Sequence, residues 1–576
     1  MKLSIDNREI EVPAGTTVLT AAQANDIYIP ALCYHPELTP YGGCRLCMVE
    51  IEGMRGYPTA CTTQVSEGMI VRTQSKRLQE MRCEMLQLIL SEHPGSCLIC
   101  DERRDCSEYM TTIRKVGMTT GCRWCPKDQD CELQKVVDYL ELEEITFPVY
   151  YRGFEPEKYD PFYDRDYNLC IYCGRCVRIC DEYRKSSVIA LNQRGRSTTI
   201  SPAFGVSHVE GDCEFCGACI TVCPTGTLSE KRRKWEGLPT SCLPAVCAFC
   251  GTHCDIQYAL KEERLIGTLP PGDAHQTGGL LCVKGRFILA DLIHHPDRLH
   301  EPVFRFEEGE GIVCWDEALD KAKTTLEQHR QEQSLFFLSP DLRSEDLLAI
   351  AQFAQNHFPG AAISSSVLTP ALTEYLLLAK HGITAEALAQ SDCLVTFLLN
   401  GNYGYAPTTL AIKQTAAKGI PYYQIGHIRD TTSRYAKRQI PLTPDKLMTF
   451  LLHLEGALSK STGDTDADAL AAALQTAKRP VLIIGQEICD FTQASELLAQ
   501  VQVLIGKLPL QVHCPLGNAN LPALLNLPEI KSKAEAEAMI NRGEVKNLIM
   551  VGTTLAPKTC LPLSCWSSVL SARQKN

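Results

Sequence analysis

The sequence predicts a multidomain protein of mixed α/β and α+β class. Thirty cysteines occur among its 576 residues, and twenty-four of them lie in the first 282 residues, mostly in tight C-x2-C groups. Beyond about residue 297, apolar strand-like runs alternate with helical runs, a pattern typical of a parallel sheet covered on both faces. We therefore expect a series of small cysteine-rich domains followed by a larger α/β domain.

The amino-acid composition and net charge argue against some classes of binding partner. The chain is 45% hydrophobic and 22% charged, with a formal net charge of −11, so it has no basic surplus that would favour nucleic acid as a partner. No apolar run approaches the roughly 18 residues of a membrane helix, and the start lacks a signal-peptide core. We expect a cytoplasmic chain without a membrane span of its own, soluble or peripherally attached to a membrane complex.

The cysteine density points to metal. A long chain without a secretion signal belongs to a reducing compartment, where clustered cysteines bind metal instead of forming disulfides. Several distinct iron-sulfur spacings follow one another here, whereas zinc would require isolated quartets. Iron-sulfur clusters are therefore favoured, and a zinc-bearing assembly protein is the alternative.

Residues 1–78 form the first predicted domain. Short strand-like runs alternate with Gly and Pro turns around one helical stretch at 17–27. The cysteines follow the pattern C-x10-C-x2-C-x13-C, which suits a 2Fe-2S cluster held by Cys33, Cys44, Cys47 and Cys61. This pattern resembles the N-terminal domain of the large iron-sulfur subunit of complex I and of related NAD-linked hydrogenases, and the resemblance implies a β-grasp 2Fe-2S domain.

Residues 79–145 form the second predicted domain. A helix is expected over 78–95, with Met81, Met85, Leu86, Ile89 and Leu90 at helical spacing and a stop at Pro94 and Gly95. It leads into an H-x3-C-x2-C-x5-C motif, which is similar to the His-ligated 4Fe-4S site of the same family. The resemblance implies a cluster bound by His93, Cys97, Cys100 and Cys106.

The C-x2-C-x5-C spacing then occurs a second time, at Cys122, Cys125 and Cys131. Met118 stands where a histidine would be expected, so a fourth ligand must come from elsewhere, and Cys83 is one candidate. An additional 4Fe-4S cluster is the favoured interpretation. A zinc site, or a loop with free thiols, stays open as an alternative.

Residues 146–238 contain two C-x2-C-x2-C-x3-C runs, the most specific signal in the chain. In two-cluster ferredoxins the fourth cysteine of each run ligates the other cluster, and the resemblance implies a ferredoxin-like domain with two 4Fe-4S clusters. The first cluster is assigned to Cys170, Cys173, Cys176 and Cys223. The second is assigned to Cys213, Cys216, Cys219 and Cys180.

Residues 239–296 carry a C-x2-C-x3-C-x27-C motif followed by Val-Lys-Gly-Arg. This motif resembles the 4Fe-4S domain that opens molybdopterin oxidoreductases such as formate dehydrogenase. The resemblance implies a further 4Fe-4S cluster bound by Cys247, Cys250, Cys254 and Cys282. It also makes Lys284 a cofactor-binding candidate, because the equivalent lysine of catalytic members lies between cluster and pterin.

Residues 297–576 resemble a molybdopterin-binding α/β domain. A working formate dehydrogenase places a selenocysteine or cysteine on the metal, and around SSSVLTP there is neither, although Ser364, Ser365 or Ser366 could in principle coordinate molybdenum. Catalytic members also continue into a β-rich domain that encloses the cofactor, whereas this sequence ends about twenty-four residues after Gly552. We expect a truncated domain without molybdenum or tungsten cofactor.

The sequence contains neither a G-x-G-x-x-G fingerprint after a strand nor a G-x4-G-K-[ST] loop, so NADH and flavin belong to a partner. We expect no catalytic residues in this chain. It would be an electron-relay subunit with one 2Fe-2S cluster, four 4Fe-4S clusters and a candidate fifth.

The expected partners are a flavin/NADH-binding subunit, a small 2Fe-2S subunit, and a further redox subunit or ferredoxin. The terminal module, whether hydrogenase, formate dehydrogenase, ferredoxin or quinone reductase, stays open. A catalytic formate dehydrogenase-type subunit is the alternative function.

Overall fold

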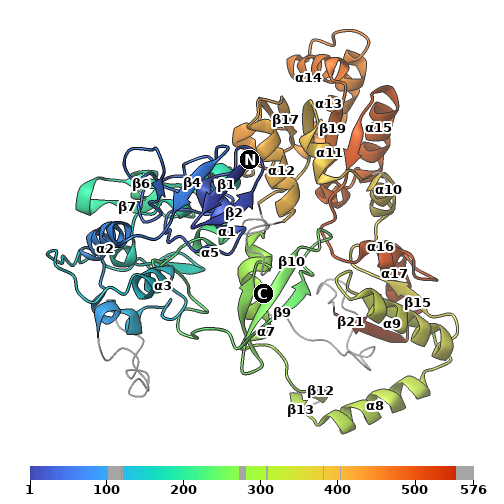
Figure 1. Cartoon of the computed structure of the whole chain (residues 1–576). Coiled ribbons are helices and arrows are strands. Elements are labelled where there is room, and N and C mark those ends of the chain that lie inside the picture. Colours follow the sequence, from blue (N-terminus) through green and yellow to red (C-terminus); the bar gives the residue numbers. More distant parts are fainter. Residues whose placement is uncertain are drawn as a thin grey trace. The chain divides into compact units, whose positions relative to one another are not determined.

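The computed structural model describes residues 1–100, 119, 121–271, 281–306, 309–379, 382–402 and 404–552. The chain divides into two compact units (Figure 1). The first consists of Met1–Ala245 and Ile256–Phe287, and the second of Val246–Asp255 and the residues from Ile288 onward. Across the described ranges, no helix has the length and apolar character that crossing a bilayer would require.

A small mixed sheet with one helix begins the first unit. The sheet order is β2-β1-β4-β3, with β1 antiparallel to β2 and parallel to β4. The helix buries Val18, Leu19, Ala21 and Ala22 in the core that the strands share. The elements are β1 Lys2–Ile5, β2 Arg8–Glu11, α1 Val18–Gln23, β3 Glu50–Ile51 and β4 Met69–Arg72. The predicted strands and helix are confirmed, and the chain between α1 and β4 carries the first four cysteines.

Helix α2, Lys76–Leu90, follows this sheet. The Ser75 hydroxyl caps it by accepting a hydrogen bond from the Leu78 N–H at 3.2 Å. The predicted helix is confirmed, but it ends at Leu90, before Pro94, which cannot continue the helical hydrogen bonds. Helix α3, Glu132–Tyr139, buries Leu133, Val136 and Val137 in the apolar cluster that also holds Leu86 and Leu90 of α2.

The next segment repeats a strand-helix-strand pattern twice. Strands β5 and β8 pair antiparallel, and so do β6 and β7. The elements are β5 Tyr163–Arg165, α4 Arg175–Arg178, β6 Ile189–Asn192, β7 Thr199–Pro202, α5 Ala218–Thr221 and β8 Leu228–Glu230. These elements are short, and their small apolar clusters contain cysteines among a few aliphatic and aromatic side chains.

A three-stranded antiparallel sheet of order β11-β10-β9 comes next. Its strands are β9 Ser241–Val246, β10 Asp255–Lys261 and β11 Arg264–Leu269. A π-helical turn over Lys284–Ile288 and helix α7, Leu289–Ile293, follow.

Two parallel sheets organise the second unit. Five strands have the order β18-β17-β16-β19-β20, and three have the order β15-β14-β21. Every pairing within these two sheets is parallel. The strands are β14 Ser334–Leu338, β15 Ala362–Ser364, β16 Cys393–Phe397, β17 Tyr422–Ile425, β18 Arg438–Ile440, β19 Pro480–Ile484, β20 Gln511–His513 and β21 Asn547–Val551.

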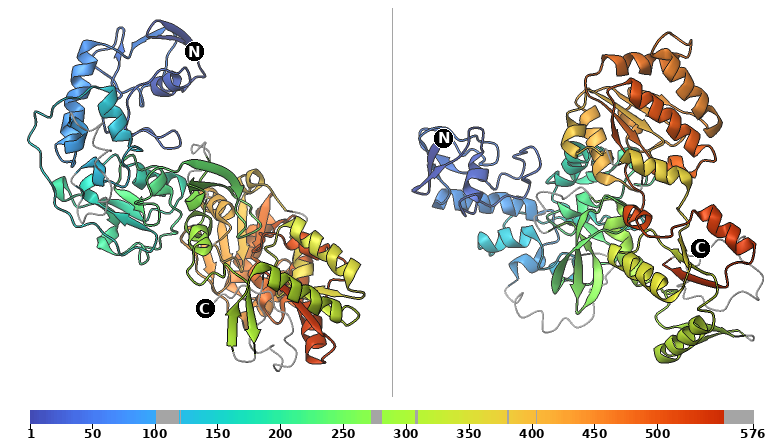
Figure 2. Two further views of the ribbon diagram at one scale, coloured as in Figure 1. Left: turned by 90° about the horizontal axis from the view of Figure 1, so that it is seen from below. Right: turned by 90° about the vertical axis from the view of Figure 1, so that its right-hand side faces the viewer.

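Helices cover both faces of the five-stranded sheet (Figures 1 and 2). Val395 and Phe397 of β16 lie in the apolar core with α13, α14 and α15, whereas Leu394 lies in a separate core with Ile412 of α12. The predicted doubly covered parallel sheet is therefore confirmed, although the sequence pattern did not reveal that the strands divide between two sheets. A hairpin of β12 Val303–Phe306 and β13 Gly309–Ile312 precedes it. The helices are α8 Trp315–Gln328, α9 Ser344–His357, α10 Pro370–Ala379, α11 Ala385–Ala389, α12 Ala406–Ala416, α13 Pro444–Ala457, α14 Thr465–Thr476, α15 Ala494–Lys507, α16 Leu521–Leu525 and α17 Lys533–Asn541.

The core of the second unit gives a stability prediction. Phe397→Ala removes a side chain that is 1% exposed, and it should lower the free energy of unfolding by about 3–5 kcal/mol through lost burial and the cavity left behind. Urea denaturation followed by far-UV circular dichroism measures the loss. Leu452→Ala, at an α13 residue that is 51% exposed, is the control and should change stability by about 0.5 kcal/mol or less. Equal losses in the two variants would contradict this packing.

Candidate iron-sulfur sites

The four thiols of the N-terminal domain come together in pairs. The thiols of Cys33 and Cys44 influence each other's ionisation, and so do those of Cys47 and Cys61. The backbone N–H of Cys44 donates to Cys33 Sγ at 3.4 Å, and that of Leu32 donates to Cys44 Sγ at 3.5 Å. The neighbouring Cys44 lowers the pKa of the Cys33 thiol to about 5. Such donors stabilise thiolate, the form in which cysteine binds metal.

This thiol loop packs directly against α4. Arg178 donates to the carbonyl oxygen of Thr39 at 2.6 Å and also to that of Cys33, and the Thr39 N–H donates to the Glu182 carboxylate at 2.7 Å. Cys44 and Cys173 line the same groove. The first thiol group is thus held next to the first ferredoxin-type motif.

The eight cysteines of the two runs form two groups, judged by which thiols interact electrostatically. The first group contains Cys170, Cys173, Cys176 and Cys223. The second contains Cys180, Cys213, Cys216 and Cys219. Each group therefore draws its fourth thiol from the other run, and Cys219 interacts with Cys223 as well.

The two motifs share a local backbone conformation. Tyr172 and Phe215 have φ of 52° and 48°, and Gly174 and Gly217 have φ of 70° and 73°. The N–H groups of Tyr172 and Phe215 donate to the sulfurs of the cysteines two residues earlier, each at 3.4 Å. Glycine suits the left-handed positions. At Gly217 a Cβ would also lie 2.9 Å from Arg286 Cγ, so the Cys216–Cys219 turn is packed against Arg286.

Two buried arginines lie beside these thiols. Arg175 makes a bidentate ion pair with Glu132, at 2.6 and 2.8 Å, and interacts with Cys173 and Cys223. Arg184 pairs with Glu214 and interacts with Cys180 and Cys216. These positive charges offset the negative charge that thiolates and clusters bring into a buried site.

Burial makes the metal-free thiols hard to ionise. It raises the pKa of Cys170 and Cys173 to about 12 each. Metal binding to such thiols must therefore displace protons that the free protein retains.

The second C-x2-C-x5-C motif packs against the turn after Cys223. The Glu132 N–H donates to the Pro224 carbonyl oxygen at 3.0 Å, and Lys127 Nζ donates to the Cys223 carbonyl oxygen at 2.7 Å. A Cβ at Gly226 would lie 2.4 Å from Cys125 Sγ, so only glycine allows the contact. Sequence inspection could not reveal these contacts, because the partners lie about 90 residues apart and have no shared motif.

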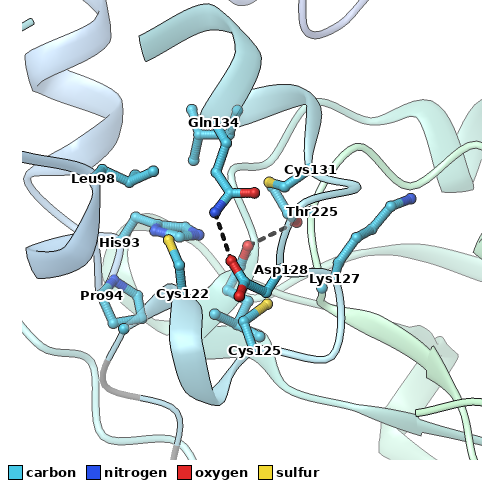
Figure 3. A pocket seen from close by; sticks show the side chains of 14 residues that line it. His93, Pro94, Leu98, Cys122, Cys125, Lys127, Asp128, Cys131, Gln134 and Thr225 are labelled. Atoms are coloured by element: carbon cyan, nitrogen blue, oxygen red, sulfur yellow. Dashed lines mark hydrogen bonds between the residues drawn. The ribbon is translucent and has the colours of Figure 1, made fainter. Parts of the chain in front are cut away.

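One cavity joins this motif to the end of α2. His93, Cys122, Cys125 and Cys131 all line it, and Figure 3 shows their side chains around it, with Gln134 donating to Asp128 at 2.9 Å. The predicted alternative ligand Cys83 does not line this cavity, and its thiol donates to the Leu140 carbonyl oxygen at 3.8 Å.

Two of the three cysteines that follow His93 lie in the described residues. Cys97 lies close to the second motif, since a Cβ at Gly121 would be 2.6 Å from Cys97 Sγ. Cys100 is exposed. Cys106 and Met118 lie outside the described residues.

Of the last predicted ligand set, Cys247, Cys250 and Cys254 belong to the second unit and Cys282 belongs to the first. In the second unit, the Cys247 N–H donates to the Cys254 carbonyl oxygen at 2.9 Å, and the Gly251 N–H next to Cys250 donates to the Leu516 carbonyl oxygen at 2.9 Å. In the first unit, Cys282 precedes the π-helical turn in which Lys284 is exposed. Arg286 of that turn is buried and pairs with Glu230 at 2.9 Å.

The segment considered for molybdenum has structural roles. The Ser364 hydroxyl donates to the Lys531 carbonyl oxygen at 3.1 Å at the end of β15, and Ser365 is fully buried. Over the described ranges, no three His, Cys, Asp or Glu side chains converge as around a single metal ion. A four-iron cluster spreads its ligands over a wider space than one ion does.

Three parts of the chain match known domain families. Residues 1–76 match a 2Fe-2S iron-sulfur cluster binding domain, residues 169–227 a 4Fe-4S dicluster domain, and residues 241–293 a molybdopterin oxidoreductase Fe4S4 domain. The predicted resemblance to iron-sulfur subunits is confirmed by these matches.

Curated relatives extend the match. The NADPH-Fe(3+) oxidoreductase subunit alpha of Geobacter sulfurreducens is 32% identical over 408 residues, which cover 69% of this chain and 44% of that protein. An NADH-quinone oxidoreductase subunit of Rhizobium meliloti is 32% identical, covering 60% of this chain and 38% of that protein. The NADP-reducing hydrogenase subunit HndD of Solidesulfovibrio fructosivorans is 31% identical, with 47% and 42% covered. The chain thus spans less than half of the length of each of these relatives.

A solved structure, an NAD+-reducing [NiFe]-hydrogenase in the H2-reduced state, matches 40% of this chain and 87% of its own, at 27% identity and a TM-score of 0.33. The domain matches and the curated relatives together show which proteins the chain resembles. Three of its segments match a 2Fe-2S domain, a 4Fe-4S dicluster domain and a molybdopterin oxidoreductase Fe4S4 domain, and the chain is similar to subunits of NADH-quinone oxidoreductases and of NADP-reducing hydrogenases.

Proposed function

We propose that the chain is the electron-relay subunit of an NAD(P)H-linked oxidoreductase complex, which passes single electrons along a series of iron-sulfur clusters. The observation that carries this proposal is the continuity of the thiol groups in the first unit. The 2Fe-2S loop contacts α4, the two ferredoxin-type groups interact through Cys219 and Cys223, and the Cys125–Cys131 motif packs on the turn after Cys223.

The ligands are proposed as four thiol sets and one histidine-containing site. The 2Fe-2S cluster takes Cys33, Cys44, Cys47 and Cys61 in a β-grasp domain. Two 4Fe-4S clusters of a ferredoxin-like domain take Cys170, Cys173, Cys176 with Cys223, and Cys213, Cys216, Cys219 with Cys180. A further 4Fe-4S cluster takes Cys247, Cys250, Cys254 and Cys282. The His93 segment, with its two cysteine trios, supplies at least one more.

Iron-sulfur clusters supply reversible one-electron chemistry, and the protein sets their potentials through hydrogen bonds, charge and exposure. The N–H groups of Tyr172 and Phe215 donate to ligand sulfurs, which stabilises the more negative, reduced state. The buried charges of Arg175 and Arg184 act in the same direction. The apolar side chains around the thiols exclude water.

The proposed partners are further redox subunits. A flavin/NADH-binding subunit and a small 2Fe-2S subunit would deliver single electrons, and a hydrogenase, formate dehydrogenase, ferredoxin or quinone module would exchange them at the other end. We further propose that the second unit is a scaffold without molybdenum or tungsten, because the Ser364 hydroxyl already has a structural partner and apolar cores cover both faces of the five-stranded sheet.

The metal inventory tests this function. Anaerobically purified full-length chain should contain about 18 iron atoms for one 2Fe-2S and four 4Fe-4S clusters, or about 22 if both trios after α2 hold clusters. Molybdenum and tungsten should be below 0.1 per chain, roughly the level of incidental metal. Elemental analysis with sulfide determination provides the numbers. Stoichiometric molybdenum or tungsten would instead support a catalytic formate dehydrogenase-type subunit, and zinc without iron would support an assembly protein.

The Arg175–Glu132 ion pair gives a redox prediction. Arg175→Gln should lower the reduction potential of the cluster at Cys170, Cys173, Cys176 and Cys223 by roughly 50–100 mV, because a lost positive charge at an effective dielectric constant of about 20 is worth about 1–2 kcal/mol. Glu132→Gln should shift the same potential upward, by a smaller amount because Glu132 is 42% exposed. EPR-monitored redox titration measures both shifts.

The matched control for this pair is Arg77→Gln, which removes an arginine that is 58% exposed and pairs with Glu80 on α2. It should leave every potential within about 10 mV because solvent screens its charge. Unchanged potentials in all three variants would show that Arg175 does not lie beside a cluster.

A further inference from the structure

We propose that His93 is the fourth ligand of a 4Fe-4S cluster held by Cys122, Cys125 and Cys131, instead of a ligand shared with the cysteines that immediately follow it. The inference rests on the proposed function only in assuming that this trio binds a cluster. It changes which trio uses the imidazole. It also replaces Cys83 as the candidate fourth ligand.

The position of His93 is fixed by the end of α2. Its backbone N–H donates to the Leu90 carbonyl oxygen at 3.1 Å, which continues the helical turn past the last α2 residue. The residue is 6% exposed, and Nδ1 is buried without a hydrogen-bond partner among the described residues. Most buried polar side-chain atoms in proteins have a hydrogen-bond partner. The unpartnered Nδ1 of His93 is therefore consistent with a metal-binding role for the imidazole.

The residues that line the cavity next to His93 could bind a metal cluster. The imidazole lies at a cavity that Cys122, Cys125 and Cys131 also line, together with the Asp128 carboxylate, which accepts a hydrogen bond from Gln134 (Figure 3). The remaining wall combines apolar or small residues with four polar ones, Lys127, Asp128, Gln134 and Thr225. One imidazole and three thiols around a single cavity make a complete ligand set for a cubic four-iron cluster.

Of the competing trio, only Cys97 and Cys100 lie in the described residues. Cys100 is exposed, whereas Cys122, Cys125 and Cys131 are all buried. Cys97 lies beside Cys122 and therefore at the edge of the same site. Cys83, on α2, is absent from the cavity lining and directs its thiol to the Leu140 carbonyl oxygen.

The histidine would have a consequence for the relay. Imidazole in place of thiolate removes one negative charge from the ligand set and raises the cluster potential. This cluster would lie against the Cys223 turn, through the Lys127 and Glu132 contacts. The proposal therefore places an electron-accepting site of raised potential next to the first ferredoxin-type group.

Nitrogen labelling distinguishes the two trios. Full-length chain produced with 15N-histidine, purified anaerobically and reduced, should show 15N coupling to a cluster in pulsed EPR. Cys125→Ser should abolish this coupling and remove about four iron atoms per chain, whereas Cys106→Ser should retain the coupling. Coupling that survives in Cys125→Ser and disappears in Cys106→Ser would overturn the proposal.

Two further variants guard against a folding defect. His93→Cys, which supplies a thiolate in place of imidazole, should keep the iron content of wild type and lose the 15N coupling. His453→Gln, at a side chain that is 46% exposed on α13, should keep both. A wild-type chain that contains full 4Fe-4S iron but shows no 15N coupling would overturn the histidine assignment alone, and a chain without 4Fe-4S iron would overturn the proposed function itself.

Discussion

The structure depends on bringing groups of thiols together in buried positions, although thiolates repel one another and lose hydration there. Backbone N–H donors and buried positive charges both stabilise the grouped thiols. Paired N–H donors at Tyr172 and Phe215 point at ligand sulfurs, and they do so because a left-handed residue precedes each motif's second cysteine and glycine follows it. Arg175 and Arg184 place buried positive charge beside the same groups. The cost of burying each arginine is offset by a carboxylate, Glu132 or Glu214.

The same contacts that hold the thiols also join one group to the next. Arg178 fixes the first loop to the helix between Cys173 and Cys180. The Pro224 carbonyl oxygen accepts from Glu132, whose side chain in turn pairs with Arg175. Electron hopping needs adjacent sites with little intervening motion, and a small domain with short strands gains that rigidity from such cross-links. The second unit has a larger apolar core, so its rigidity depends less on such cross-linking hydrogen bonds and ion pairs.

Local patterns carried most of the predictable information. Alternating and helical periodicity located β1, β4, α2 and the parallel strands of the second unit, because those elements bury one face or both in an apolar core. Cysteine spacing predicted the ligand sets, and the resemblance to two-cluster ferredoxins added the exchange of Cys180 and Cys223 between the two runs. The division into two parallel sheets was not predictable, since every strand of both sheets carries the same apolar signal.

For His93, sequence spacing and the structure point to different cysteine trios. Cys97 follows His93 closely in the sequence, so spacing alone pairs them, but the chain returns to the end of α2 with Cys122, Cys125 and Cys131. The Arg175–Glu132 pair is separated by 43 residues, and neither residue belongs to a ligand motif. Long-range contacts of this kind follow from how α2 and α3 pack together around Leu86, Leu90 and Leu133, which no local pattern encodes.

The central claim is that the thiol groups form one continuous one-electron relay. An anaerobic reductive titration of the full-length chain, followed by EPR, tests it most directly. The account predicts uptake of about five or six single electrons per chain, one per cluster, with spin–spin interaction between neighbouring reduced clusters. Uptake of fewer than about two electrons, or reduced clusters that show no magnetic interaction, would contradict it.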